Sequence, residues 1–391
     1  MNQKLFPIII ILSASFFFSA CTLKEKEIRV GGIFDLTGPT SETGNHYAEG
    51  IKDYIHYLNS KGGINRKKIR LFSHDSAYVT SRHRAAYETL TTENHVHLMF
   101  GWGTGSSEEL MKDISRDEIP YTSVSYSEIL GDPEYAPYNF LTSVSYSDQI
   151  GIILAFIKKN GKNAGRPPRV AILHNETQFG FSPLKAADEF ARKNGIEIVA
   201  KEVVTLEAQE AFEQLEIVKE KKADYVIIQE TAWATSVILK NAQRMKLDSR
   251  FVGLIWSGDD KLIALAGKDS EGFISVFPVT YQDSSLPGMK AIFNYYDEIN
   301  KKRDKINFRY INGWVTAMIM FEGVRRAGDD LSGLSIKNAL EKIKNFDTGG
   351  LTYPVSFSPE SHKGLIKLKI GKVHQGSWKM ITDFVDAEDL K

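Results

Sequence analysis

Small polar residues and glycines follow two apolar runs in the first third of the chain. The first set comes after the run at 96–100 and the second after the run at 120–124: Trp102, Thr104, Gly105 and Ser106, then Ser125, Tyr126 and Ser127. Hydroxyl groups, glycine amides and the free N–H groups that begin a helix bind carboxylates and other oxygen-rich groups. This pattern predicts a face that holds the oxygen-bearing end of a small ligand.

Aromatic and acidic residues take the same positions in the middle third of the chain. Phe179 follows the run at 170–174, Glu230 and Thr231 come at the end of the run at 225–230, and Asp259 follows 251–256. In open parallel sheets, ligands bind beyond the carboxyl ends of the strands. We therefore expect a small molecule to be held between an oxygen-binding face and an aromatic, acidic face.

Each of these residues also has a purely structural interpretation. Ser106 and its neighbour Ser107 are good N-terminal caps for the following helix, and so is Asp259 for its own helix. Trp102 and Phe179 are equally typical of a hydrophobic core. The hypothesis of a binding site depends on the whole set lying at one predicted edge.

The elements that must position these residues alternate between strands and helices. Helical periodicity recurs between strand-like runs at 28–34, 68–74, 96–100 and 120–124, and a second series of the same kind begins near residue 146. This alternation predicts an α/β fold with parallel central sheets in two Rossmann-like lobes. The last third lacks a full series, so we expect its helices at 289–302, 310–326 and 336–343 and its strand-like runs at 272–277, 351–357, 365–370 and 378–383 to complete both lobes through a multi-strand hinge.

These patterns divide the chain into three parts. Residues 1–20 form a predicted signal peptide, residues 28–146 with 277–348 form the first lobe, and residues 147–276 with 349–391 form the second. The signal peptide ends in small residues directly before Cys21, after the apolar run at 5–18. Such a run is shorter than the roughly 20 residues that span a membrane.

Cys21 is the only cysteine of the chain. A cysteine directly after small residues resembles a bacterial lipobox, in which the thiol carries lipid and becomes the new N-terminus. Cleavage without lipid and an uncleaved anchor are the alternatives. With one thiol, no disulfide forms within the chain, and the fold depends on its core.

The charges of the chain exclude one class of partner. Lys and Arg number 49 and Asp and Glu also number 49, so the net charge is +0, whereas nucleic-acid binding needs a basic surface. His95 and His97 have no matching Cys, His or Asp cluster nearby, so we predict no metal site. We also predict no cofactor.

Several motifs together resemble one family. The segment 33–39 (Ile-Phe-Asp-Leu-Thr-Gly-Pro) is similar to the opening "L-T-G-P" motif of type I periplasmic binding proteins of the leucine/isoleucine/valine group. The segment 59–64 resembles that group's "N-x-x-G-G-I", 69–75 its "I-x-L-x-x-x-D", and 178–180 its aromatic-glycine turn. The resemblance runs from about residue 28 to 380 and implies two lobes that close over a solute.

The resemblance implies a role and a set of ligand contacts. The protein would capture a solute outside the cytoplasm and deliver it to an ABC permease, as a monomer tethered to a membrane through Cys21. The first lobe would bind the ligand through Thr104, Gly105, Ser106, Ser125 and Ser127, with Thr43 at the mouth of the cleft. Phe179 would pack on the ligand, and Thr231 would lie where the family often has another aromatic.

The sequence departs from the family at one expected contact. Amino-acid binders hold the ammonium group of the ligand with an acid, and that position here is Ile255. Glu230 or Asp259 would have to substitute. An amino-acid-like ligand, an amide and an organic acid are therefore all consistent with the sequence.

The motifs of two other classes of function are incomplete or absent in this sequence. Residues 101–106 follow a strand and open a helix, but a dinucleotide-binding fingerprint needs Gly or Ala at the sixth position, where Ser106 stands. No hydrolase or phosphate-loop motif is present. We predict that the chain is not an enzyme, with a ligand-sensing domain that signals to a separate receptor and an exported α/β enzyme as alternatives.

Overall fold

The computed structural model describes residues 27–161 and 165–390. Cys21 and the predicted signal peptide at 1–20 lie outside the described residues. No helix in the described ranges is both long and apolar enough to cross a membrane.

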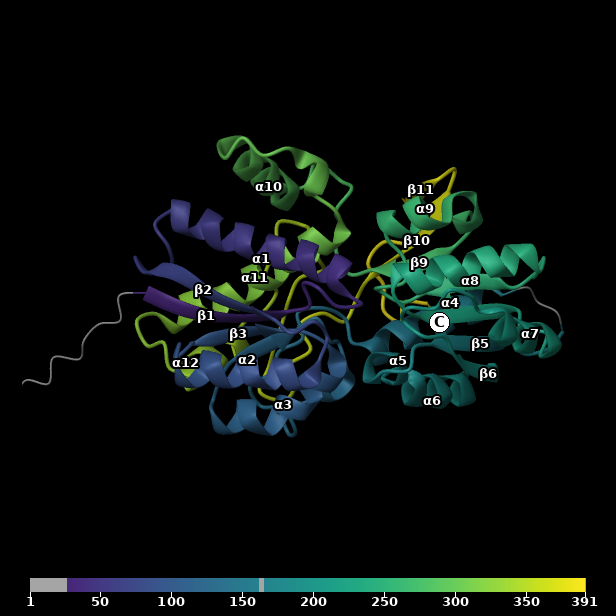
Figure 1. The fold of residues 1–391 in the computed structure, drawn as a ribbon, viewed down its shortest axis with the longest axis horizontal. Helices are drawn as coiled ribbons and strands as arrows, with labels where there is room; N and C mark the ends of the chain where they lie inside the picture. Colours follow the sequence, from purple (N-terminus) through teal and green to yellow (C-terminus); the bar gives the residue numbers. More distant parts are fainter. Residues whose placement is uncertain (1–26, 162–164, 391) are drawn as a thin grey trace, which may run out of the picture.

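The first sheet has four parallel strands in the order β2-β1-β3-β4. Its strands are β1 (Glu27–Phe34), β2 (Lys68–Asp75), β3 (Leu98–Gly101) and β4 (Tyr121–Ser123). Six helices accompany it: α1 (Ser41–Ser60), α2 (Thr80–Thr92), α3 (Thr104–Arg116), α10 (Pro287–Glu298), α11 (Phe308–Ala327) and α12 (Gly333–Glu341). In Figure 1, α1 and α10 lie above this sheet and α2 and α3 below it.

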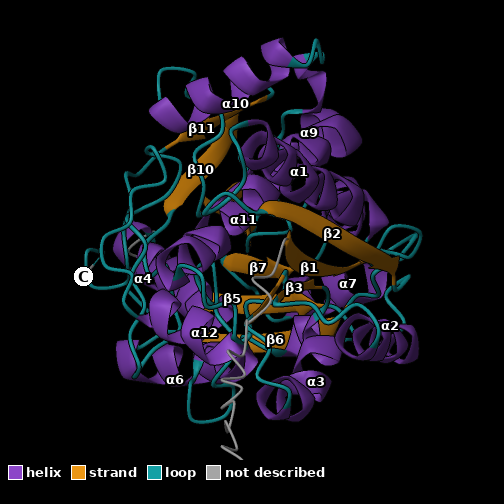
Figure 2. Cartoon of the chain, turned by 90° about the vertical axis from the view of Figure 1, so that its left-hand side faces the viewer, coloured by secondary structure: helices purple, strands orange, loops and turns teal. Residues whose placement is uncertain are grey.

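The second sheet has seven strands in the order β11-β10-β9-β8-β7-β5-β6. Its strands are β5 (Arg169–His174), β6 (Glu197–Val203), β7 (Tyr225–Gln229), β8 (Arg250–Gly253), β9 (Ile274–Phe277), β10 (Lys369–His374) and β11 (Ser377–Met380). Its helices are α4 (Tyr146–Asn160), α5 (Gln178–Phe181), α6 (Leu184–Asn194), α7 (Phe212–Glu220), α8 (Ala232–Arg244) and α9 (Asp260–Ala266). Helices lie outside the central strands of both sheets (Figure 2), whereas the edge strands β2 and β6 are partly exposed.

The predicted fold class is confirmed, with one difference in the second sheet. The five strands β6, β5, β7, β8 and β9 pair in parallel, but β10 and then β11 add to β9 in antiparallel orientation at one edge. The predicted strand at 351–357 is wrong, because this segment has only an isolated bridge between Phe346 and Val355. Leu351 and Phe357 are buried, so the segment is apolar for packing reasons, and Pro354 has no N–H to give to a ladder.

The chain passes between the sheets at three places in the described ranges: between β4 and α4, between β9 and α10, and between α12 and β10. Two of these crossings touch, since Leu141 forms a bridge with Lys363 and the ring of Phe140 stacks on His362. The exact lobe boundaries at 146/147, 276/277 and 348/349 stay predictions.

The closest helix contact in the first lobe joins α1 and α11. A Cβ atom on Gly50 of α1 would collide with the carbonyl oxygen of Tyr310, and one on Gly313 of α11 would collide with that of Tyr47. The two helices therefore touch backbone to backbone, which only glycine allows.

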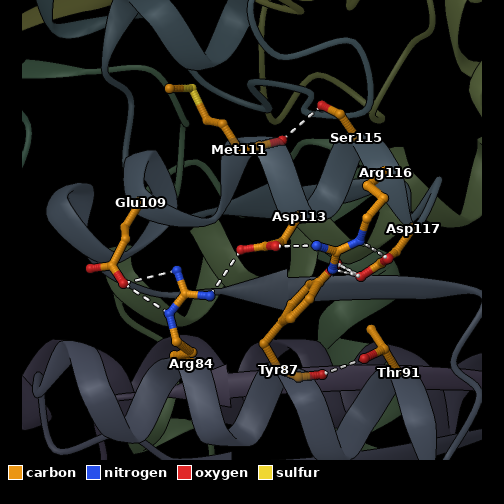
Figure 3. A network of polar contacts seen from close by, with 9 residues as sticks. All are labelled: Arg84, Tyr87, Thr91, Glu109, Met111, Asp113, Ser115, Arg116 and Asp117. Carbon is orange, nitrogen blue, oxygen red and sulfur yellow. Dashed lines mark hydrogen bonds and ion pairs between the residues drawn. The ribbon is translucent and has the colours of Figure 1, made fainter.

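Ion pairs hold α2 and α3 side by side (Figure 3). Arg84 of α2 reaches Glu109 and Asp113 of α3, each at 2.9 Å. The Tyr87 hydroxyl donates to Asp117, 2.9 Å away, at the end of α3. Because α3 begins at Thr104, this network also fixes the direction of its first turn.

Candidate functional site

A cavity of about 40 Å³ lies between the two lobes. Both lobes contribute to its lining. The first lobe gives Thr40, Thr43, Tyr78, Trp102, Gly103, Thr104 and Val124, and the second gives Phe179, Thr231 and Trp256, together with Tyr146 at the boundary, where α4 begins. Aromatic rings make up much of this lining, and no charged side chain is part of it.

A buried carboxylate shapes the loop between β1 and α1. Asp35 accepts hydrogen bonds from the N–H groups of Gly38 at 2.5 Å and Thr40 at 2.8 Å, and from the Thr40 hydroxyl at 2.6 Å. The same hydroxyl accepts from the indole N–H of Trp102 at 2.9 Å. The ring of Trp102 also meets that of Tyr47 edge to face at 5.7 Å, so its orientation is fixed from two sides.

A second carboxylate positions Tyr78. Asp75 accepts from the N–H groups of Leu36 at 2.8 Å and Ala77 at 3.0 Å, and from the Thr37 hydroxyl at 2.6 Å. Burial opposes ionisation of Asp75, but the hydrogen bonds from Thr37 and the backbone outweigh it and lower its pKa. Ala77 and Tyr78 both have left-handed backbone conformations, with φ of 48° and 60°, which bring the Tyr78 ring to the cavity.

The start of α3 supplies N–H donors. Gly103 precedes the helix with φ of 79°, and no side chain caps the first turn. The first N–H groups of a helix have no partner within it, and Gly103 and Thr104 line the cavity. The Thr104 hydroxyl accepts from Ser125 at 2.9 Å. This corner of the cavity suits a carboxylate or another oxygen-rich group.

The second lobe forms an aromatic wall. The indole N–H of Trp256 donates to the Tyr146 hydroxyl at 3.1 Å, and that hydroxyl donates to the carbonyl of Val124 at 3.3 Å. The rings of Tyr146 and Phe179 lie 5.5 Å apart. These polar atoms are already paired, so the wall presents mainly apolar surface to a ligand.

Two acids of the second lobe lie near the cavity in different surroundings. Asp259 accepts from the N–H groups of Lys261 and Leu262 as the cap of α9 and forms an ion pair with Arg309 of the first lobe at 2.5 Å. Glu230 is fully buried, and one of its oxygens accepts from the Thr231 N–H at 3.3 Å. Its other oxygen has no partner, and burial raises the pKa of Glu230 well above its usual value.

The structure brings five of the predicted site residues into the cavity lining: Thr43, Trp102, Thr104, Phe179 and Thr231. The others lie outside the lining: Gly105, Ser106, Ser125, Tyr126, Ser127, Glu230 and Asp259. Ser127 instead donates to Glu108 at 2.6 Å, and Tyr126 stacks behind the wall on Trp256. Contact of any of these residues with a ligand stays a prediction.

The sequence pattern missed several lining residues, namely Thr40, Tyr78, Gly103, Val124, Tyr146 and Trp256. Tyr146 and Trp256 were visible at the start of a helix and the end of a strand, but nothing distinguished them from core aromatics. The position of Tyr78 depends on two residues after β2 with left-handed backbone conformations, which the sequence does not predict. No group of three metal-ligating side chains exists in the described ranges.

Comparison with known proteins gives a consistent result. A family model described as periplasmic binding protein matches residues 27–377. The Leu/Ile/Val-binding protein of Escherichia coli strain K12 is 23% identical over 301 residues, which cover 76% of this chain and 78% of that protein. A leucine-, isoleucine-, valine-, threonine- and alanine-binding protein of Pseudomonas aeruginosa is 21% identical over 314 residues, covering 80% and 82%.

Two solved structures share the fold. A branched-chain amino acid ABC transporter protein from Thermus thermophilus with bound valine has a TM-score of 0.86 and 24% identity, covering 93% of this chain and 97% of that one. An ABC transporter substrate-binding protein from Aeropyrum pernix has a TM-score of 0.84 and 26% identity, covering 92% and 96%.

Proposed function

The chain belongs to the periplasmic binding protein family, and on this premise we propose that it is the substrate-binding protein of an ABC importer. Like its relatives, it is a binding protein and not an enzyme. The family is exported, and we propose that Cys21 anchors this chain to a membrane by lipid. We further propose that it works as a monomer and hands its ligand to the membrane subunits of the importer.

We propose that the ligand is a small molecule with an apolar body and a carboxylate. The observation that carries this proposal is one cavity lined by rings from both lobes and by the uncapped start of α3. The rings of Trp102, Phe179 and Trp256 would desolvate the apolar body, and the first N–H groups of α3 would hold the carboxylate. Relatives named for leucine, isoleucine and valine support this ligand class.

We propose that the lobes separate to admit the ligand. A cavity of about 40 Å³ is far smaller than the pockets of roughly 300–1,000 Å³ that enclose drug-sized ligands. The chain crosses between the lobes at three places, where a hinge motion of the kind known for such two-lobed proteins can occur.

Thermal unfolding of the purified protein with L-leucine, L-valine and L-phenylalanine tests the proposed function. A ligand at 100 times its dissociation constant adds about 2.7 kcal/mol of stability, which is readily measured as a shift in Tm. We expect at least one of the three to raise the Tm. No shift with any of them, or with their carboxylic acids lacking the amino group, would contradict the proposal.

The Phe179→Ala variant tests the location of the site. Removing this ring should weaken ligand binding about tenfold or more, because a buried aromatic side chain contributes well over 1.4 kcal/mol. Phe181→Ala is the matched control, since Phe181 lies two residues away on the same short helix but is 45% exposed and outside the lining. Equal losses of affinity in both variants would show that the ligand does not bind against Phe179.

A further inference from the structure

Most carboxylates around the cavity are fully engaged within the protein. Asp35 accepts three hydrogen bonds from its own loop, and Asp75 accepts two from that same loop after β1 and one from Ala77. Asp259 caps α9 and pairs with Arg309. Each oxygen of these three acids already has at least one partner within the protein.

Glu230 is different. Among the described side chains it is the only carboxyl group with a buried oxygen, Oε1, that has no hydrogen-bond partner. Its residue is fully buried at the end of β7, and its other oxygen bonds to the N–H of Thr231, which lines the cavity. Glu230 therefore lies directly behind the lining of the interlobe cavity.

The groups that face Glu230 do not compensate its charge. From the loop between β5 and α5, Glu176 adds a like charge, which further raises the pKa of Glu230 beyond the effect of burial. Tyr78 faces Glu230 from the opposite lobe. Burial is the main cause that raises the pKa of the Tyr78 hydroxyl to about 12, and the charge of Glu230 contributes to this rise, so the hydroxyl stays neutral. Among the residues that the structure describes, no cationic side chain contributes to the pKa shift of Glu230. A buried carboxyl group in this position costs stability unless a partner arrives.

We propose that Glu230 is the specificity-determining residue of this cavity and that its Oε1 takes the ammonium group of an amino-acid ligand. This inference rests on the proposed function and names the charge of the ligand. Ile255, at the position where the family has an acid, is buried in the core and donates its N–H to Gln149, so it supplies no acidic contact. The inference places that contact at the end of β7 instead.

With Glu230 in this role, ligand binding is coupled to the release of a proton. Without ligand, burial raises the pKa of Glu230 and so favours its protonated form. An ammonium group beside it favours the carboxylate, so the pKa of Glu230 falls on binding and its proton goes to solvent. Binding of an ammonium ligand therefore weakens as the pH is lowered below the raised pKa, whereas binding of a ligand without that group does not.

Calorimetric titration of the Glu230→Gln variant with L-leucine and with 4-methylpentanoate, which is leucine without its amino group, tests the inference. We expect a loss of affinity of about tenfold or more for L-leucine and a change below about threefold for 4-methylpentanoate, because a hydrogen bond to a charged group is worth roughly 1.5–3 kcal/mol. Glu176→Gln is the matched control, since Glu176 is a neighbouring acid with an exposed side chain, and it should leave both affinities nearly unchanged.

Equal losses for the two ligands, or none, would overturn the role of Glu230 and leave the proposed function standing. Wild-type binding of 4-methylpentanoate without binding of L-leucine would do the same. Absence of binding for both ligands would overturn the inference and the proposed ligand class together.

Titration of the wild-type protein in buffers of different ionisation enthalpy gives a second readout that needs no variant. We expect a net release of protons with L-leucine and none with 4-methylpentanoate. Proton release that is the same for both ligands would contradict the inference, even if the Glu230→Gln variant failed to fold.

Discussion

At the scale of residues, the buried acids of this protein separate by whether the fold provides their partners. Asp53 of α1 is buried, and it accepts from the hydroxyls of Tyr310 at 3.1 Å and Tyr295 at 3.4 Å and from the Lys301 ammonium group at 3.0 Å. It ties α1 to α10 and α11 and has no role at the cavity. Glu230 has no such partners, and this contrast is what marks it for ligand binding.

The Asp53→Asn variant should lower the free energy of unfolding by about 2 kcal/mol, because it removes a charge that is paired with two buried tyrosine hydroxyls and the partly exposed Lys301. Urea-induced unfolding measures the change. Glu298→Gln is the control, since it breaks a half-exposed pair with Lys61 and should cost less than about 1 kcal/mol. A similar loss in both variants would show that burial of Asp53 does not matter.

The sequence predicts residues of the site where they come directly after the end of a strand. Trp102, Thr104, Phe179 and Thr231 each follow a strand and reach the cavity, because the carboxyl ends of parallel strands meet at one edge. Ser127 follows a strand as well, but Glu108 takes its hydroxyl. Such competition between a ligand and a neighbouring side chain depends on distances between elements, which the sequence does not contain.

At the scale of elements, the packing of α1 on α11 fixes the frame of the first lobe. The glycines at 50 and 313 let the two backbones touch, and the loop that begins α1 carries Thr40 and Thr43 to the cavity. A wider spacing of the two helices would displace this side of the lining.

The Gly313→Ala variant should destabilise the protein by about 3 kcal/mol or more, since the added methyl group meets the rigid backbone of Tyr47. Gly151→Ala is the matched helix control, because its methyl group would only reach normal contact with Phe190 at 3.5 Å. We expect this control to be neutral or to gain up to about 1 kcal/mol from helix propensity. Thermal unfolding compares the two, and equal stability would contradict the close crossing.

The order of strands and helices was predictable because alternating apolar runs and helical periods persist over the first two thirds of the chain. The end of the chain was less so. The predicted run at 365–370 overlaps β10 by only two residues, Lys369 and Ile370, and the run at 351–357 packs as a loop. Apolar residues that cover a core look the same in a sequence whether or not their backbone joins a ladder.

At the scale of the whole molecule, two ion pairs connect the lobes beside the cavity. Asp259 of the second lobe meets Arg309 of α11, with both side chains nearly buried, and Lys261 meets Glu42 of α1 at 2.8 Å. Because the first pair is shielded from water, it should contribute more to holding the lobes together than the exposed second pair.

The Arg309→Met variant should therefore weaken ligand affinity about tenfold, since closing the lobes would leave the carboxylate of Asp259 buried without its partner. Calorimetric titration measures the affinity, and small-angle scattering with ligand present should show a larger radius of gyration than for the wild type. Lys261→Met, at the exposed pair, should change affinity less than threefold. Unchanged affinity and radius in Arg309→Met would show that the pair does not hold the lobes.

Two of the five tryptophans of the chain, Trp102 and Trp256, lie in the cavity lining from opposite lobes, whereas Trp314 and Trp378 are buried away from it and Trp233 is exposed. A ligand bound between the two indoles would change the surroundings of both rings at once. Capture should therefore change the intrinsic fluorescence of the protein without any attached dye. If these rings enclose the solute as proposed, the molecule is an optical reporter of its own occupancy.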